Sequence, residues 1–185
     1  DKFMARIRAI KPEAVEIINV DELCENGIMW DTAKIPAVVE KFRRVGIDAL
    51  FLPFCDFGEE QVVAQIAGAF KVPTLVWGAR DERPNSDEVR GRDTQCGMFA
   101  ATKVLRRYGV KYSYIWNCET ESDDFAKGYE NFIRVAAVLK ALKNLRVAKI
   151  GERPVPFMSV MTNEANLINR IGITTVPISP FAVAE

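Results

Sequence analysis

Aromatic and acidic side chains follow one of the clearest strand patterns in this sequence. The apolar run Ile47 to Phe54 leads into the loop 55–60, which reads Cys-Asp-Phe-Gly-Glu-Glu. An aromatic ring such as that of Phe54 can stack on a polyol, and a carboxylate such as that of Asp56 can accept hydrogen bonds from hydroxyl groups. The loop therefore predicts the rim of a polyol-binding pocket. The alternative is structural: Asp56 or Glu59 caps the next helix while the aromatic rings pack on it.

The segment after Trp77 holds the densest charge pattern of the chain. It connects a strand pattern to a helix pattern and contains four arginines and five acids between Gly78 and Thr94. Such connections usually have about 2–6 residues, and longer ones are often functional. One interpretation is that Arg90 and Arg92 hold a ligand oxygen or a neighbouring subunit. The other is that Asp93 or Thr94 caps the next helix and the arginines pair with acids at the surface.

A third loop, Trp116 to Ser122, adds an aromatic, an amide and two acids at another strand end. It fits either a polar pocket or a capping turn before the next helix. The sequence has no glycine-rich phosphate loop, which argues against a nucleotide-dependent enzyme. The sequence also has no histidine, which excludes imidazole chemistry within these residues. No set of carboxylates has the spacing of a metal site, so no metal ligand and no catalytic residue is assigned to this chain.

The elements that must position these loops alternate between helix and strand patterns. Expected helices lie at 1–10, 32–45, 59–70, 94–108 and 122–145, and expected strands at 14–20, 47–54, 72–77 and 110–116. Strands separated by helices pair in parallel through right-handed crossovers. The pattern predicts an α/β fold with a Rossmann-like, doubly wound parallel sheet in three α/β/α layers. Its loops at the carboxyl ends of the strands are where ligands bind in such folds.

A second α/β unit is expected to begin near residue 145. A strand at 146–150, a helix at 163–171 and a strand at 173–178 form a new series. We therefore expect an N-terminal domain over 1–144 and the start of a central domain over 145–185. The chain opens within a helix pattern and stops after a strand, so a preceding strand and a following portion are expected to be missing.

The composition narrows the function class. Of 185 residues, 25 are Lys or Arg and 25 are Asp or Glu, so the net charge is zero and nucleic-acid binding is not expected. No apolar stretch approaches the about 18 residues of a membrane span. The four cysteines are far apart, as in reduced cytosolic proteins. We expect a cytoplasmic protein without a membrane partner.

Several segments carry a likeness to known enzymes. Residues 92–105 (Arg-Asp-Thr-Gln-Cys-Gly-Met-Phe-Ala-Ala-Thr-Lys-Val-Leu) are preceded by 77–84 (Trp-Gly-Ala-Arg-Asp-Glu-Arg-Pro) and followed by 110–118 (Val-Lys-Tyr-Ser-Tyr-Ile-Trp-Asn-Cys). Together with 12–15 and the loop after Leu52, they resemble the N-terminal region of the L-fucose isomerase and L-arabinose isomerase family. Residues 150–154 and 163–167 resemble the opening of that family's central domain.

The resemblance implies an aldose–ketose isomerase that is cytosolic and needs a divalent cation such as Mn²⁺ for chemistry through a cis-enediol. It implies a homo-oligomer, trimeric or hexameric, with active sites at subunit junctions and with the catalytic and metal-binding residues in later parts of the protein. This chain would help to close a neighbour's sugar pocket and to assemble the oligomer, and would be inactive alone. The implied substrate contacts are Phe54 and Asp56, with Trp77, Arg90 and Arg92 as further candidates.

A different class of protein fits the same residues. A stand-alone flavodoxin-like or periplasmic-binding-protein-like module would bind a sugar without any chemistry. The extent of the reading frame separates the two hypotheses: a continuation that supplies histidine and carboxylates favours the isomerase.

Overall fold

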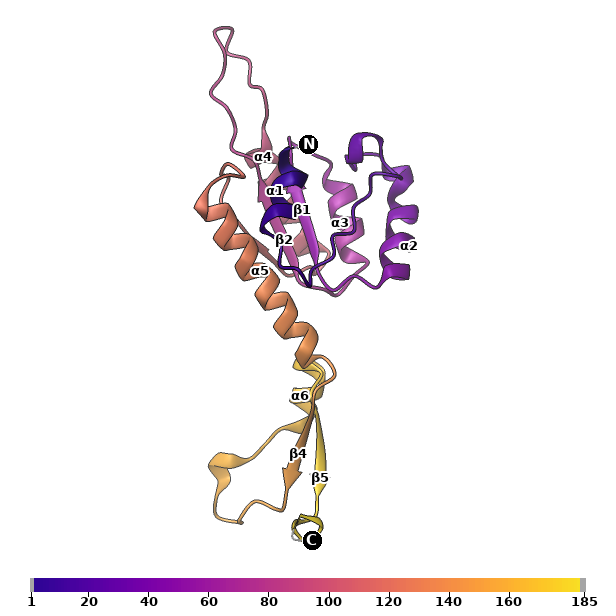
Figure 1. Cartoon of the computed structure of the whole chain (residues 1–185), viewed down its shortest axis with the longest axis vertical. Helices are drawn as coiled ribbons and strands as arrows, with labels where there is room; N and C mark the ends of the chain where they lie inside the picture. Colours follow the sequence, from indigo (N-terminus) through magenta and orange to yellow (C-terminus); the bar gives the residue numbers. More distant parts are fainter. Residues whose placement is uncertain (1, 184–185) are drawn as a thin grey trace. The chain divides into compact units, whose positions relative to one another are not determined.

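The computed structural model describes residues 2–183. The chain divides into two compact units, with the boundary between Ala136 and Ala137 (Figure 1). The helices are α1 (Lys2–Ile10), α2 (Ile35–Val45), α3 (Glu60–Gly68), α4 (Thr94–Arg107), α5 (Asp123–Leu142) and α6 (Glu164–Ile171). The strands are β1 (Leu50–Phe54), β2 (Thr74–Gly78), β3 (Tyr112–Tyr114), β4 (Arg146–Ile150) and β5 (Thr174–Ile178). Short 3₁₀ turns cover Glu25–Gly27, Thr32–Lys34, Met158–Val160 and Pro180–Ala182. None of the described helices combines the length and the apolar character that crossing a bilayer requires.

The first unit is built on a parallel sheet with the strand order β1-β2-β3. Leu52 pairs with Val76, and Val76 pairs with Tyr114 on the other side of β2. The expected parallel α/β architecture is confirmed. The order of the described strands runs in one direction, without the reversal that defines a doubly wound sheet.

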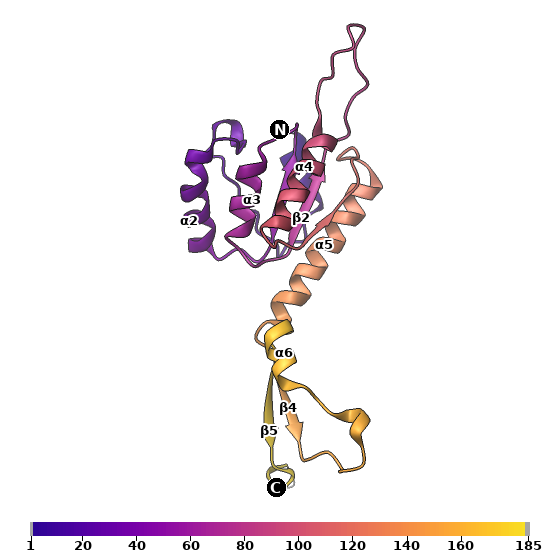
Figure 2. The same ribbon diagram turned by 180° about the vertical axis from the view of Figure 1, so that it is seen from behind.

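Helices cover both faces of this sheet. Leu50, Leu52 and Phe54 alternate with Phe51 along β1, and the two sets belong to different apolar clusters. The first cluster joins β1 and β2 to α2, α3 and α4 (Figure 2), and the second joins them to α1 and α5 (Figure 1). All residues of β2 are buried, as the apolar sequence predicts for a central parallel strand.

The strand expected at 14–20 is wrong, because the described residues of this segment form no β ladder. Its apolar side chains do alternate: Ile18 and Val20 pack on the first cluster, and Ile17 packs on the second. The carbonyl of Asn19 accepts a hydrogen bond from Lys41 Nζ at 2.6 Å. The alternation of apolar residues therefore arises because successive side chains pack on different clusters. This segment does so without forming strand-to-strand hydrogen bonds.

The second unit is a β4-α6-β5 series. Arg146 pairs with Thr174 and Ile150 with Ile178 in a parallel register. Helix α6 is capped before its first residue by Asn163, whose Oδ1 accepts from Asn166 N at 3.0 Å, and after its last residue by Gly172 with φ 83°. No described residue of this unit is buried, and large apolar side chains such as Val155 and Phe181 are 84% exposed. Parallel strands normally have both faces covered, so the described part of this unit leaves apolar surface open.

A glycine sets how closely the loop after β1 approaches α4. A Cβ on Gly97 would lie 1.9 Å from the carbonyl oxygen of Phe57, a backbone atom that cannot rotate away. We predict that Gly97→Ala lowers the free energy of unfolding by about 3 kcal/mol in urea titrations. The matched control is Gly68→Ala, where the new Cβ meets only the half-exposed ring of Tyr108. Because alanine favours the helix, this control should change the free energy by less than about 1 kcal/mol. Equal effects of both substitutions would contradict the close contact.

Candidate functional site

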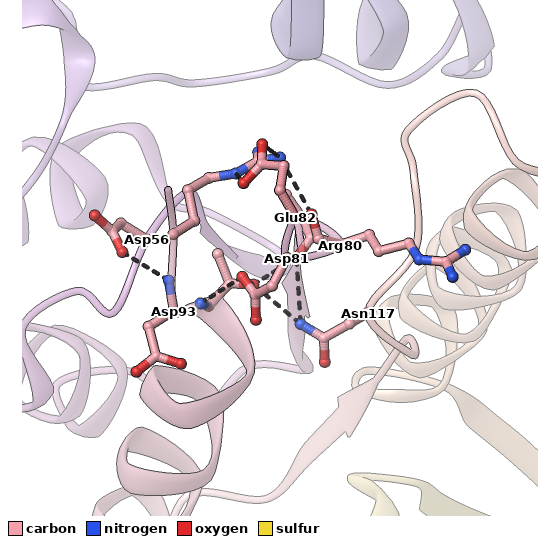
Figure 3. A network of polar contacts seen from close by, with 9 residues as sticks. Asp56, Arg80, Asp81, Glu82, Asp93 and Asn117 are labelled. Atoms are coloured by element: carbon pink, nitrogen blue, oxygen red, sulfur yellow. Dashed lines mark hydrogen bonds and ion pairs between the residues drawn. The ribbon is translucent and has the colours of Figure 1, made fainter. Parts of the chain in front are cut away.

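The carboxyl ends of β1, β2 and β3 meet at one edge of the sheet, where the three loops singled out in the sequence lie together. Hydrogen bonds and ion pairs connect them into one group, which we call the strand-end network (Figure 3). Its members are Asp56, Ala79, Arg80, Asp81, Glu82, Arg92, Asp93, Thr94 and Asn117.

Asp81 closes the N-terminus of α4. Its Oδ1 accepts from Thr94 N at 2.8 Å, and its Oδ2 accepts from Gln95 N at 3.0 Å. The Thr94 hydroxyl lies 2.6 Å from the same Oδ1. The first N–H groups of a helix have no hydrogen-bond partner within the helix, and they lie at the positive end of its dipole. The Asp81 carboxylate supplies both the missing acceptor and a negative charge.

The same contacts shift the pKa of Asp81. Partial burial raises this pKa, but the hydrogen bonds from the Thr94 hydroxyl and from the backbone N–H groups of Gln95 and Thr94 outweigh it, and the charge of Arg92 adds to them. The net result is a pKa below the ordinary value of 3.8. The ionised form of Asp81 is the one that the fold stabilises.

Thr94 and Asn117 connect β2 with β3. Asn117 Nδ2 donates to Ala79 O at 3.3 Å and lies 3.2 Å from Thr94 Oγ1, while the Thr94 hydroxyl also reaches the Ala79 carbonyl. A Cβ on Gly78 would lie 2.9 Å from Asn117 Nδ2 and 2.6 Å from Met98 Sδ. The end of β2 therefore needs a residue without a side chain to admit these partners.

Asp56 connects the loop after β1 to the start of α4. Its Oδ1 accepts from Phe57 N at 2.7 Å and from Asp93 N at 3.0 Å. It does not cap α3, whose cap is Glu59, with Oε1 3.4 Å from Gln61 N. Of the two acids considered for that cap, Glu59 is the one that caps α3. Asp56 instead binds the backbone of Asp93, 37 residues further along the sequence.

Arg92 holds the base of the long connection between β2 and α4. It forms an ion pair with Glu82 and donates from Nη2 to Arg80 O at 3.1 Å. The hydrogen bond to Glu82 raises the pKa of Arg92, and the pKa of Glu82 falls for the same reason. Beyond this base the connection continues as an exposed arm, which turns where Asn85 Oδ1 accepts from Val89 N at 2.9 Å (Figure 1).

The two outcomes left open for the arginines can now be compared. Arg92 pairs with Glu82, and Arg90 Nη1 lies 3.2 Å from Asp93 Oδ1 in an exposed pair. The predicted pairing with acids is confirmed for these two arginines, whereas a ligand or subunit contact of either stays a prediction. Asp93 is the N-cap residue of α4, as one interpretation expected, but its side chain makes no capping hydrogen bond. The carboxylate that accepts from the first N–H groups belongs to Asp81.

Phe54 and Trp77 lie in the interior of this unit. Phe54 is 4% exposed, so its ring packs in the core, as the structural interpretation of this loop has it. Trp77 is 2% exposed and stacks on Phe3 at a ring distance of 5.3 Å. Both belong to the faces of buried strands, which explains their burial. A substrate contact of either ring stays a prediction.

The most exposed aromatic in the three loops is Trp116. Trp116 is 72% exposed and packs edge-on against Tyr114 at 5.5 Å. It belongs to the third loop, whose expected helix cap is confirmed at Ser122, with Oγ 3.2 Å from Phe125 N. Both Trp77 and Trp116 stand at strand ends in the sequence, and of the two Trp77 is the predicted candidate contact. Only the alternation of faces, with buried neighbours on both sides of β2, separates them.

The network does not by itself enclose a metal or a cavity. No three His, Cys, Asp or Glu residues in the described part of the chain are placed to hold a metal ion. Two surface hollows of about 420 and 240 Å³ lie beside residues 8–17 and 23–34, and no network residue lines either. The arrangement can offer polar and charged contacts to a ligand.

Comparisons with known proteins find a family whose model covers the first unit. Residues 1–143 match the family model for the fucose/sulfoquinovose isomerase N-terminal domain. A sulfoquinovose isomerase of Priestia aryabhattai is 23% identical over 150 residues, which are 80% of this chain and 32% of that protein. Sulfoquinovose isomerases of Clostridium sp. (strain MSTE9) and Alkalicoccus urumqiensis are 24% and 25% identical over 64% and 70% of the chain, and 26% and 29% of their own lengths. The chain spans about a third of the length of the curated relatives that it matches.

The first prediction concerns the cap. Asp81→Ala removes the partner of two backbone N–H groups and should lower the free energy of unfolding by about 1–2 kcal/mol at pH 7. Asp93→Ala is the matched control, because Asp93 directly precedes α4 but pairs only with exposed Arg90. It should cost less than about 0.5 kcal/mol. A larger loss for Asp93→Ala than for Asp81→Ala would refute the assignment.

The stability difference between the wild type and Asp81→Ala depends on pH, because the pKa of Asp81 is lowered in the folded protein. A carboxylate with a lowered folded pKa contributes its full stability above the ordinary value of 3.8, and loses it as the pH falls through the lower folded value. The difference in unfolding free energy between wild type and Asp81→Ala should therefore shrink in acid. Urea titrations across that range measure the difference; a constant gap would contradict the shift.

Because Phe54 is buried, its substitution separates a role in the core from a role in sugar binding. Phe54→Ala should cost about 3–5 kcal/mol of stability, because the ring fills the core beside α3 and α4. Phe57→Ala, in the loop that follows Phe54 and 41% exposed, should cost less than about 1 kcal/mol. Thermal melts of both variants give the comparison. An undisturbed melt for Phe54→Ala together with weakened sugar binding would instead support the predicted substrate contact.

Proposed function

Because residues 1–143 match that N-terminal domain, the chain belongs to the fucose/sulfoquinovose isomerase family, and from this membership we propose that it is the N-terminal part of an aldose–ketose isomerase. Its proposed substrate class is a sulfonated hexose of the sulfoquinovose type, since the similar proteins are sulfoquinovose isomerases. The match over three quarters of the chain is the observation that carries the proposal.

Within that protein we assign this chain a role in sugar-pocket closure and subunit assembly. The strand-end network supports this role, because it fixes three loops at the edge of the sheet where ligands bind in parallel α/β folds. A rigid edge positions contact groups better than separate mobile loops do. As part of the same proposal, the first unit is a Rossmann-like three-layer domain and the protein is a cytoplasmic trimer or hexamer.

The chemistry itself is proposed to depend on residues outside this chain. The described residues offer no cluster of three metal ligands, and the sequence has no histidine. A divalent cation such as Mn²⁺, which would polarise the sugar oxygens during enediol formation, does not fit the described residues. The alternative function, a sugar-binding module without catalysis, would share the network but would lack such residues in the rest of the protein.

The test is an isomerase assay on the complete protein. Incubation with sulfoquinovose, followed by NMR of the C1 and C2 carbons, should show the ketose accumulating to an equilibrium. Removal of divalent cations with a chelator should stop the conversion, and Mn²⁺ should restore it. Sugar binding without any ketose, in the presence of Mn²⁺, would favour the binding module and contradict the isomerase.

A further inference from the structure

The four arginines of the connection between β2 and α4 differ in what their guanidinium groups contact. Arg92 pairs with Glu82 and Arg90 with Asp93. Among residues 2–183, the side chains of Arg80 and Arg83 make no hydrogen bond or ion pair. Of these two, Arg80 follows the end of β2 by two residues, while Arg83 lies on the exposed arm.

The backbone that carries Arg80 is held on both sides. Ala79 N donates to Phe54 O at 3.1 Å, and Ala79 O accepts from Asn117 Nδ2 at 3.3 Å. The carbonyl of Arg80 accepts from Arg92 Nη2 at 3.1 Å, and the next residue, Asp81, is fixed on α4. Arg80 therefore has a fixed main chain and a free cationic head, which lowers the entropy that a ligand contact would cost.

The neighbouring acids Asp56, Asp81 and Glu82 make their hydrogen bonds with other donors and none with the Arg80 side chain. Asp81 accepts from Thr94 and Gln95, Glu82 accepts from Arg92, and Asp56 accepts from Phe57 and Asp93. In Figure 3 the Arg80 side chain extends away from the carboxylates of Asp81 and Glu82. The N-terminus of α4, which could otherwise attract an anion, is occupied by Asp81.

We propose that the guanidinium of Arg80 binds the anionic substituent of the sugar substrate, a sulfonate. This inference rests on the proposed function and adds to it the residue that recognises the charge. A planar guanidinium presents paired N–H donors that match the oxygens of a sulfonate, as they match carboxylate and phosphate. The contact distinguishes the sulfonated hexose from a neutral 6-deoxyhexose, which offers no charge at that position.

The experiment compares two sugars with three variants of the complete protein. The sugars are sulfoquinovose and 6-deoxyglucose, which differ by the sulfonate, and the variants are Arg80→Gln, Arg80→Lys and Arg83→Gln. Arg80→Gln should lower kcat/KM for sulfoquinovose by about 10- to 100-fold, mainly through KM, and change the value for 6-deoxyglucose by less than about twofold. Arg80→Lys should recover part of the loss. Arg83→Gln, an equally unpaired arginine of the arm, should alter neither sugar.

Three outcomes would overturn the inference. They are an unchanged kcat/KM for sulfoquinovose in Arg80→Gln, an equal loss for both sugars, and the same loss in Arg83→Gln, which would indicate general electrostatic attraction rather than a contact. Calorimetric titration of sulfoquinovose into the same variants repeats the test without turnover. If the wild type binds sulfoquinovose but isomerises no sugar, the proposed function fails, and the loss of binding in Arg80→Gln alone still supports the contact.

Discussion

The placement of Asp81 on the first turn of α4 is the interaction on which the strand-end network depends. One carboxylate satisfies the N–H groups of Thr94 and Gln95 and orders the chain three residues beyond β2. Once α4 starts at that point, Thr94 can reach Ala79 and Asn117, and Asp93 N can reach Asp56. Gly78 and Gly97 make the arrangement possible, because a Cβ at either position would collide with a neighbour. A helix start fixed from 13 residues away thus joins the ends of three strands.

The sequence allowed prediction of what is encoded locally. The parallel strand–helix alternation, the helix ends at Gly46 and Gly172 with left-handed φ angles of 72° and 83°, and the strand Arg146–Ile150 all follow from short patterns. Non-local features were missed. Nothing near Asp81 marks it as the cap of a helix that begins after a long connection, and the apolar alternation of 14–20 does not tell two-sided burial from strand pairing. Phe54 and Trp77 are strand-end residues by position, but their burial depends on which helices cover each face.

The division of roles between the arginines has a consequence for specificity. Arg92 forms an ion pair with Glu82 and a hydrogen bond to the Arg80 carbonyl, so its guanidinium is already engaged within the chain. Its role at the site is to hold the base of the arm in place. Arg80 shares the same ordered backbone but keeps its charge available. Membership of the fucose/sulfoquinovose isomerase family gives that free charge a proposed ligand, since the matched relatives are sulfoquinovose isomerases and sulfoquinovose carries a sulfonate.

The central claim is that Asp81 holds the start of α4, and amide hydrogen exchange tests it most directly. The N–H groups of Thr94 and Gln95 would be open to water in an uncapped helix, because first-turn amides have no partner within the helix. The account predicts that both amides are protected in the wild type and exchange at least about tenfold faster in Asp81→Ala, while the interior amide of Ala101 stays unchanged. Exchange of Thr94 and Gln95 at unprotected rates in the wild-type protein would contradict the account.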